Sequence, residues 1–138
     1  MLVAEAWAEI LVCRARLRFP RLFGTESWLR RELGCDQEKQ AGTDQADVLL
    51  LAFRRAQGAS PEAAGCLPRA LALRRYLARH GQQGRLGLGL KREKGRLRGH
   101  AWVEVAGRIA SDDEAFVRSF TSLQAARSAR SVAPFEEG

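Results

Sequence analysis

Residues 65–81, GCLPRALALRRYLARHG, decide the predicted fold because they combine a well-defined helix start with a cysteine. Pro68 is tolerated in the first turn of a helix, where its missing N–H has no helical partner, so the helix should begin near Cys66. Apolar side chains then recur on one broad arc, and Gly81 predicts the C-terminal end of the helix. Arg74 falls inside the apolar arc, and the sequence offers no reason for this.

The pattern changes from helical to alternating downstream of this helix. RLGLGLKRE (85–93) and GRLRGHAWVEVAGR (95–108) predict two antiparallel strands with a turn between them. A further turn at Ala106–Gly107 predicts a short third strand, and AFVRSFTSL (115–123) predicts another strand. We therefore expect a small antiparallel sheet.

Helices are expected upstream of residue 60. They cover residues 2–18, a short segment from Thr25 or Ser27 through Arg31 or Leu33 that Gly34 ends, and a segment from Asp44 or Asp47 that Gly58 closes. Helices followed by a sheet are typical of the α+β class. We expect a single domain with a helical N-terminal part (1–60), a core of helix and sheet (61–124) and a flexible tail (125–138).

The composition restricts the class of protein. The chain carries a net charge of +7, and 46% of its residues are hydrophobic, which is enough for a packed core. A basic surface could attract nucleic acid, anionic lipid or an acidic peptide, although a bias towards Ala, Arg, Gly and Leu explains the charge equally well. The arginines are spread along the chain, without the aromatic-studded basic sheet that is typical of RNA-binding domains, so we expect no nucleic acid.

The cysteines and the N-terminal segment indicate a reduced, cytoplasmic protein with free thiols. The three cysteines form no Cys-x-x-Cys pair, so no metal site is expected. No basic and then apolar leader is visible at the N-terminus, and no apolar run approaches the roughly 20 residues that span a bilayer. We therefore expect no association with a membrane.

Cys66 stands where a thiol can become a nucleophile. The dipole and the free N–H groups of a helix N-terminus favour the thiolate form of a cysteine. The same N–H groups can hold the oxyanion that forms when a thiolate attacks an amide. The alternative is a small buried apolar residue, which is what we expect of Cys13 and Cys35, because neither begins a helix.

His100 is the candidate base for this thiol. It lies in the second predicted strand with Trp102 and Glu104 on the same face, because side chains alternate along a strand. Asp112 follows the next turn and would return beside His100, where a carboxylate fixes the tautomer of a catalytic imidazole. Asp113 would point to the opposite face. The alternatives are a core or surface histidine, a turn or capping role for Asp112, and a solvated face for Glu104 instead of contact with a substrate amine.

The order of these residues, with Cys on a helix start, His on a strand and Asp after the next turn, resembles the transglutaminase-like cysteine proteinase fold. CLPRALALRRYLARHG, LGLGLKRE and GHAWVEVAGR, followed by Asp112, are similar to the leader peptidases of lasso-peptide maturation. The similarity covers residues 66 to about 113. The chain departs from the family pattern at Ala70, where the family has Ser, at Gly99, where it has Ala, and at Ser111, where it often has Asn.

The resemblance implies a transglutaminase-like or papain-like core, in which a catalytic helix packs on the small sheet. Cys66 would be the nucleophile, His100 the general base and then acid, and Asp112 the orienting carboxylate. Arg69 matches the family's arginine after the cysteine, and its role is either structural or substrate-facing. Trp102 and Glu104 would contact substrate or support the site. The resemblance implies no cofactor.

The implied substrate is a ribosomal precursor peptide, from which the enzyme removes the leader. With no spare domain for leader capture, the chain resembles the split form of the family. It would need a separate leader-recognition protein and pass the trimmed core to an ATP-dependent cyclase. The surface around Trp7 and residues 19–28 is the expected docking region, because of its aromatic side chains. Two alternatives stay open: a transglutaminase-like acyltransferase, and a non-catalytic basic module that binds peptide or nucleic acid while Cys66 is buried.

Overall fold

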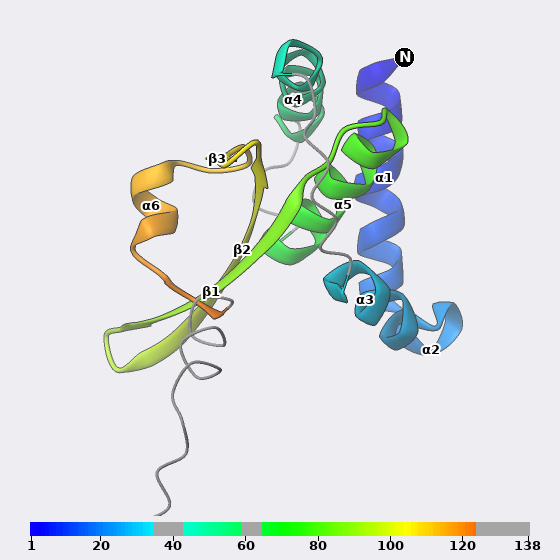
Figure 1. Cartoon of the computed structure of the whole chain (residues 1–138). Coiled ribbons are helices and arrows are strands. Elements are labelled where there is room, and N and C mark those ends of the chain that lie inside the picture. The colour runs from blue at the N-terminus through cyan, green and yellow to red at the C-terminus, as the bar shows by residue number, and fades with distance from the viewer. Residues whose placement is uncertain (35–42, 59–64, 124–138) are drawn as a thin grey trace, which may run out of the picture.

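The computed structural model describes residues 1–34, 43–58 and 65–123, so Cys35, most of the predicted linker, the connection before residue 65 and the predicted tail lie outside the described residues. Its elements follow in the order α1 (Leu2–Arg18), α2 (Pro20–Phe23), α3 (Thr25–Gly34), α4 (Thr43–Gln57), α5 (Cys66–Arg79), β1 (Arg85–Glu93), β2 (Arg96–Val105), β3 (Arg108–Ile109), α6 (Glu114–Arg118) and β4 (Thr121–Ser122). The N-terminal helices gather beside α5, and α5 lies against the sheet (Figure 1). The predicted α+β class is therefore confirmed.

The N-terminal helices have nearly the predicted extents, because local signals set their ends. Pro20 occupies the first position of α2, where a residue needs no N–H. Gly24 ends this helix in the left-handed conformation, with a φ of 57°, and separates α2 from α3. The next helix, α4, begins at Thr43, one residue before the earlier of its two predicted starts.

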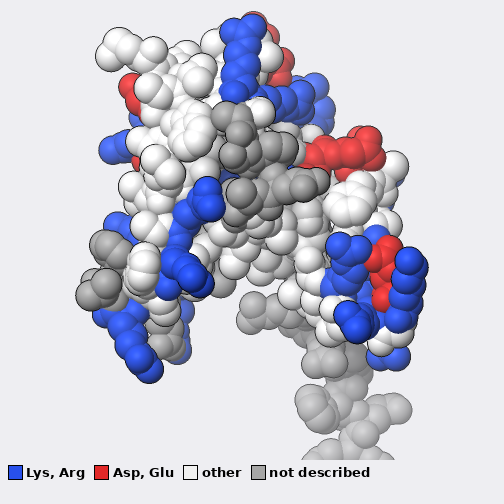
Figure 2. Space-filling model, turned by 180° about the vertical axis from the view of Figure 1, so that it is seen from behind, with Lys and Arg blue, Asp and Glu red and all other residues white. Residues whose placement is uncertain are grey.

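Ion pairs attach α1 and α3 to the polar side of α5. Arg75 and Arg79 each place a guanidinium nitrogen 2.9 Å from the carboxylate of Glu9, which is only 3% exposed. Arg74, unexplained in the sequence, lies 3.7 Å from Glu32 of α3. Figure 2 shows the basic side chains of one face in separate groups, with uncharged surface between them. Part of the positive charge of the chain therefore serves the fold.

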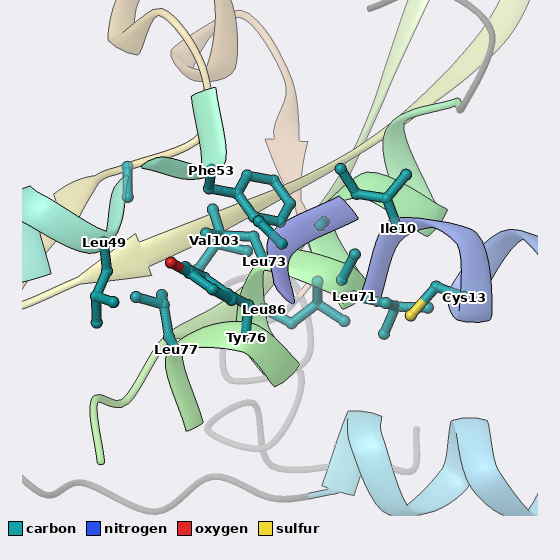
Figure 3. Packing of buried hydrophobic residues seen from close by; sticks show 14 of the residues in the cluster. Ile10, Cys13, Leu49, Phe53, Leu71, Leu73, Tyr76, Leu77, Leu86 and Val103 are labelled. Carbon is teal, nitrogen blue, oxygen red and sulfur yellow. The ribbon is translucent and has the colours of Figure 1, made fainter. Parts of the chain in front are cut away.

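The apolar side of α5 forms the centre of the core. Leu71, Leu73, Tyr76 and Leu77 are each no more than 1% exposed. Figure 3 shows them among side chains from α1, α4 and the two longest strands. Complete burial of one such side chain contributes about 1.5–3 kcal/mol, so this contact fixes the position of α5 on the sheet.

The sheet has the strand order β3-β2-β1-β4, and all neighbouring strands are antiparallel. β1 and β2 pair along their length, with Gly89 opposite His100. Ala101 and Val103 are buried in the same core as α5. Because side chains alternate along β2, His100 and Trp102 lie on the opposite face, as predicted.

The prediction of a strand over residues 115–123 is wrong for its first half, where the chain forms α6, and correct only for β4. The Asp113 side chain accepts a hydrogen bond from the Phe116 N–H at 3.0 Å and caps this helix. The cap satisfies an N–H group that a strand would have paired with a neighbour. A local capping signal therefore outweighs the apparent alternation of this segment.

The docking surface predicted from aromatic side chains is only partly exposed. Trp28 is 4% exposed, and the guanidinium groups of Arg16 and Arg75 lie over its ring. Trp7 packs against the core, whereas Phe19 is 53% exposed. The argument from exposed aromatic residues is therefore wrong for Trp28.

The packing of Trp102 requires a glycine at position 87. A Cβ atom at Gly87 would lie 2.2 Å from the buried indole ring, whereas a Cβ atom at Gly99 of β2 would meet nothing closer than 3.6 Å. We predict that Gly87→Ala lowers the free energy of unfolding by about 1–3 kcal/mol and that Gly99→Ala has little effect. Urea denaturation measures both values. Equal stability of the two variants would contradict this packing.

Candidate active site

Cys66 is the first residue of α5; it is a free cysteine, partly buried and packed against the hydrophobic core. Gly65, directly before it, has φ 72° and ψ 160°, a conformation that residues with a Cβ atom rarely adopt. This glycine lets the chain turn into the helix at the thiol. The N–H groups of the first turn have no partner within the helix, and Pro68 contributes no N–H to this turn. The predicted position at a helix start is confirmed.

His100 and Asp112 lie together, as predicted. Nε2 of His100 lies 3.4 Å from Oδ2 of Asp112, and the two side chains are 10% and 12% exposed. This Nε2 atom is buried and has no hydrogen-bond partner within the described residues, so its approach to Asp112 is close without forming a hydrogen bond. The distance exceeds that of a usual hydrogen bond, as is common in catalytic groups before a substrate binds. The arrangement can orient the imidazole through Nε2 and leave Nδ1 available for proton transfer.

Hydrogen bonds attach the bend that carries Asp112 to β2. The Ala110 N–H donates to the Val103 carbonyl at 2.8 Å, and the Val103 N–H donates to Ser111 Oγ at 3.0 Å. The Ser111 hydroxyl donates in turn to Asp112 Oδ2 at 2.9 Å. Asp113, the alternative to Asp112 in the sequence, caps α6 instead. The chain reversal after β2 therefore brings Asp112, not Asp113, to His100.

Aromatic side chains surround the His100 imidazole. The ring centroids of Phe116, Phe120 and Trp102 lie 5.0, 5.2 and 6.3 Å from that of the imidazole. Lys91 places its Nζ 4.7 Å from the Phe120 centroid. These contacts limit rotation of the imidazole. Sequence reasoning misses both phenylalanines, although their four-residue spacing is a signal that favours a helical turn over a strand.

Trp102 and Glu104 share the His100 face of β2, as predicted. The indole N–H of Trp102 donates to Glu104 Oε1 at 3.0 Å. This bond gives Glu104 a supporting role beside the aromatic side chains. Contact of either residue with a substrate stays a prediction.

Arg69 connects α5 with the bend that carries Asp112. It lies three residues after Cys66, so the two side chains leave the helix on the same side. Its Nη2 donates to Asp112 Oδ1 at 2.8 Å. Arg69 and His100 therefore face different oxygens of one carboxylate, a connection that the sequence does not indicate.

The second histidine, His80, pairs with a carboxylate of another helix. It lies directly after α5, and its Nε2 is 2.9 Å from Oε2 of Glu5 in α1.

Within residues 1–34, 43–58 and 65–123, no group of three or more His, Cys, Asp or Glu side chains is placed to hold a metal ion. None of the helices in these ranges combines the length and apolar character of a membrane span.

Comparison with known proteins identifies the superfamily of the chain. A family model described as the transglutaminase-like superfamily matches residues 10–125, a range that includes Cys66, His100 and Asp112. The chain belongs to the transglutaminase-like superfamily. This superfamily includes cysteine peptidases and acyltransferases. No curated protein and no solved structure gives a significant match.

The two described cysteines should differ in reactivity. Cys13 is buried in α1, and burial raises the pKa of its thiol to about 12. Only about 10⁻⁴ of such a thiol is ionised at pH 8, and the thiolate is the reactive form. We predict that iodoacetamide at pH 8 modifies Cys66 and spares Cys13 in the folded protein, while both react in urea. Peptide mass spectrometry measures the extent, and equal modification of both in the folded protein would contradict these environments.

Proposed function

We propose that the chain is a cysteine peptidase that removes the leader from a ribosomal precursor peptide during lasso-peptide maturation. Membership of the transglutaminase-like superfamily supports thiol-based acyl transfer. The resemblance of the segments around Cys66 and His100 supports the choice of a leader as substrate. The observation that carries the proposal is the 3.4 Å approach of His100 to Asp112, a carboxylate that α5 also contacts through Arg69.

In the first step, His100 takes the proton of the Cys66 thiol, and the sulfur attacks the carbonyl carbon of the amide that joins leader to core. The N–H groups in the first turn of α5 can hold the oxygen that becomes negatively charged. The protonated His100 then donates its proton to the leaving amine of the core. The C–N bond breaks, and the leader stays attached to Cys66 as a thioester.

Water completes the reaction. His100 accepts a proton from a water molecule, whose oxygen attacks the thioester carbonyl. The C–S bond breaks, and the proton returns from His100 to the Cys66 sulfur. The leader departs as a free acid, and both side chains regain their starting states.

The Asp112 carboxylate has two tasks in this scheme. It accepts the N–H at Nε2 of His100, which leaves Nδ1 unprotonated and ready to accept the thiol proton. It also stabilises the imidazolium that forms after that transfer. Phe116 and Phe120 hold the ring in this orientation through their contacts with it.

The proposal includes two partners. A separate leader-recognition protein would present the precursor, and an ATP-dependent cyclase would receive the trimmed core, as the resemblance to split leader peptidases implies. The reaction would take place in the cytoplasm, where free thiols such as that of Cys66 stay reduced.

We predict that Cys66→Ala and His100→Ala each slow leader removal by about 10³-fold or more, because each removes a group that carries the reaction. The assay incubates the chain with the precursor and the recognition protein and follows the peptide masses. Cys13→Ala and His80→Ala are matched controls, because they remove the same chemical groups away from Asp112. Parent-like cleavage by Cys66→Ala would contradict the proposal, and a new amide with an added amine in place of hydrolysis would favour an acyltransferase.

We predict that Asp112→Asn preserves the fold and slows cleavage by about 10²–10⁴-fold, because an amide does not stabilise the imidazolium or select its tautomer. Asp113→Asn should retain most activity, since its side chain serves α6. Circular dichroism checks the fold, and single-turnover cleavage measures the rate. The opposite ranking of the two variants would assign the orienting role to Asp113.

A further inference from the structure

The bend that carries Asp112 does not by itself fix the orientation of the Asp112 carboxylate. Asp112 follows directly on Ser111, whose hydroxyl donates to Oδ2, the same oxygen that faces His100. A partial rotation of the carboxylate about its Cβ–Cγ bond would turn Oδ2 away from His100. A second contact at Oδ1 restricts this rotation.

Arg69 supplies that contact from a different element. Its Nη2 donates to Oδ1 at 2.8 Å, and its side chain is only 20% exposed. A charge-assisted bond of this length is among the stronger hydrogen bonds in proteins. Because the arginine belongs to the first turns of α5, it also couples the position of Asp112 to the helix that begins at Cys66.

We propose that Arg69 is a positioning residue, which holds the Asp112 carboxylate so that Oδ2 faces His100 and which ties this pair to the nucleophile's helix. The inference rests on the proposed peptidase function. It also decides between the structural and the substrate-facing roles that the sequence leaves open for Arg69. A guanidinium that is bound to Asp112 and mostly covered acts on the reaction through that carboxylate.

Two substitutions test the inference. Arg69→Met removes the contact with Asp112 and should lower kcat roughly 10- to 100-fold with little change in KM, because a small displacement of a catalytic group costs about this much. Arg69→Lys keeps the charge without the planar geometry and should recover part of the rate. Added guanidinium ion should partly restore Arg69→Met. Arg79→Met, on the same helix but paired with Glu9, is the matched control and should behave as the parent.

The combined variant Arg69→Met/Asp112→Asn gives the sharpest result. If Arg69 acts through Asp112, the double variant should be no slower than Asp112→Asn alone, because groups that act as one unit give non-additive effects. Additive losses, or a rise in KM with kcat unchanged in Arg69→Met, would overturn the inference and favour contact with the substrate.

The failure of this inference differs from failure of the proposed function. Loss of cleavage in Cys66→Ala together with parent-like kinetics of Arg69→Met would overturn only the role of Arg69. Parent-like cleavage by Cys66→Ala would overturn the function itself. The imidazole ¹⁵N signals of His100 provide a measurement without substrate: Arg69→Met and Asp112→Asn should both shift them and Arg79→Met should not. Unchanged signals in Arg69→Met would also count against the coupling.

Discussion

The candidate site depends on the contacts of the Asp112 carboxylate, because three parts of the chain meet there. Arg69 of α5 binds one oxygen, while Ser111 of the bend after β3 and His100 of β2 face the other. A carboxylate that is 12% exposed has lost most of its water, and partners of this kind are needed to offset that loss. The same carboxylate connects Arg69 in the first turns of α5 to the strand that carries His100.

Further contacts of the bend and of α5 support this arrangement. Arg54 of α4 donates to the Ala110 carbonyl at 3.2 Å, two residues before Asp112. On the other side of the molecule, Glu9 of α1 binds α5 through Arg75. The N-terminal helices therefore support the helix that carries Cys66.

One face of β2 packs into the core, and the opposite face carries the candidate catalytic histidine. Ala101 and Val103 enter the core with α5, so that face anchors the strand. The opposite face carries His100, and α6 with the residues after it places Phe116 and Phe120 against the imidazole. A strand that is anchored on one face can thus present a well-oriented imidazole on the other.

The long helices α1, α4 and α5, the shorter α3 and the two long strands were predictable from the sequence, because periodicity, Pro68 at a helix start and glycines at helix ends act over a few residues. The positions of Cys66 at a helix start and of His100 on a strand were predictable for the same reason. The folded structure alone decided that Arg69 and Asp112, 43 residues apart, form a pair and that Arg74 meets Glu32. It also decided that α6 places Phe116 against the imidazole. Such pairings depend on how α5 and the bend after β3 pack in space, and no local pattern of residues encodes that distance.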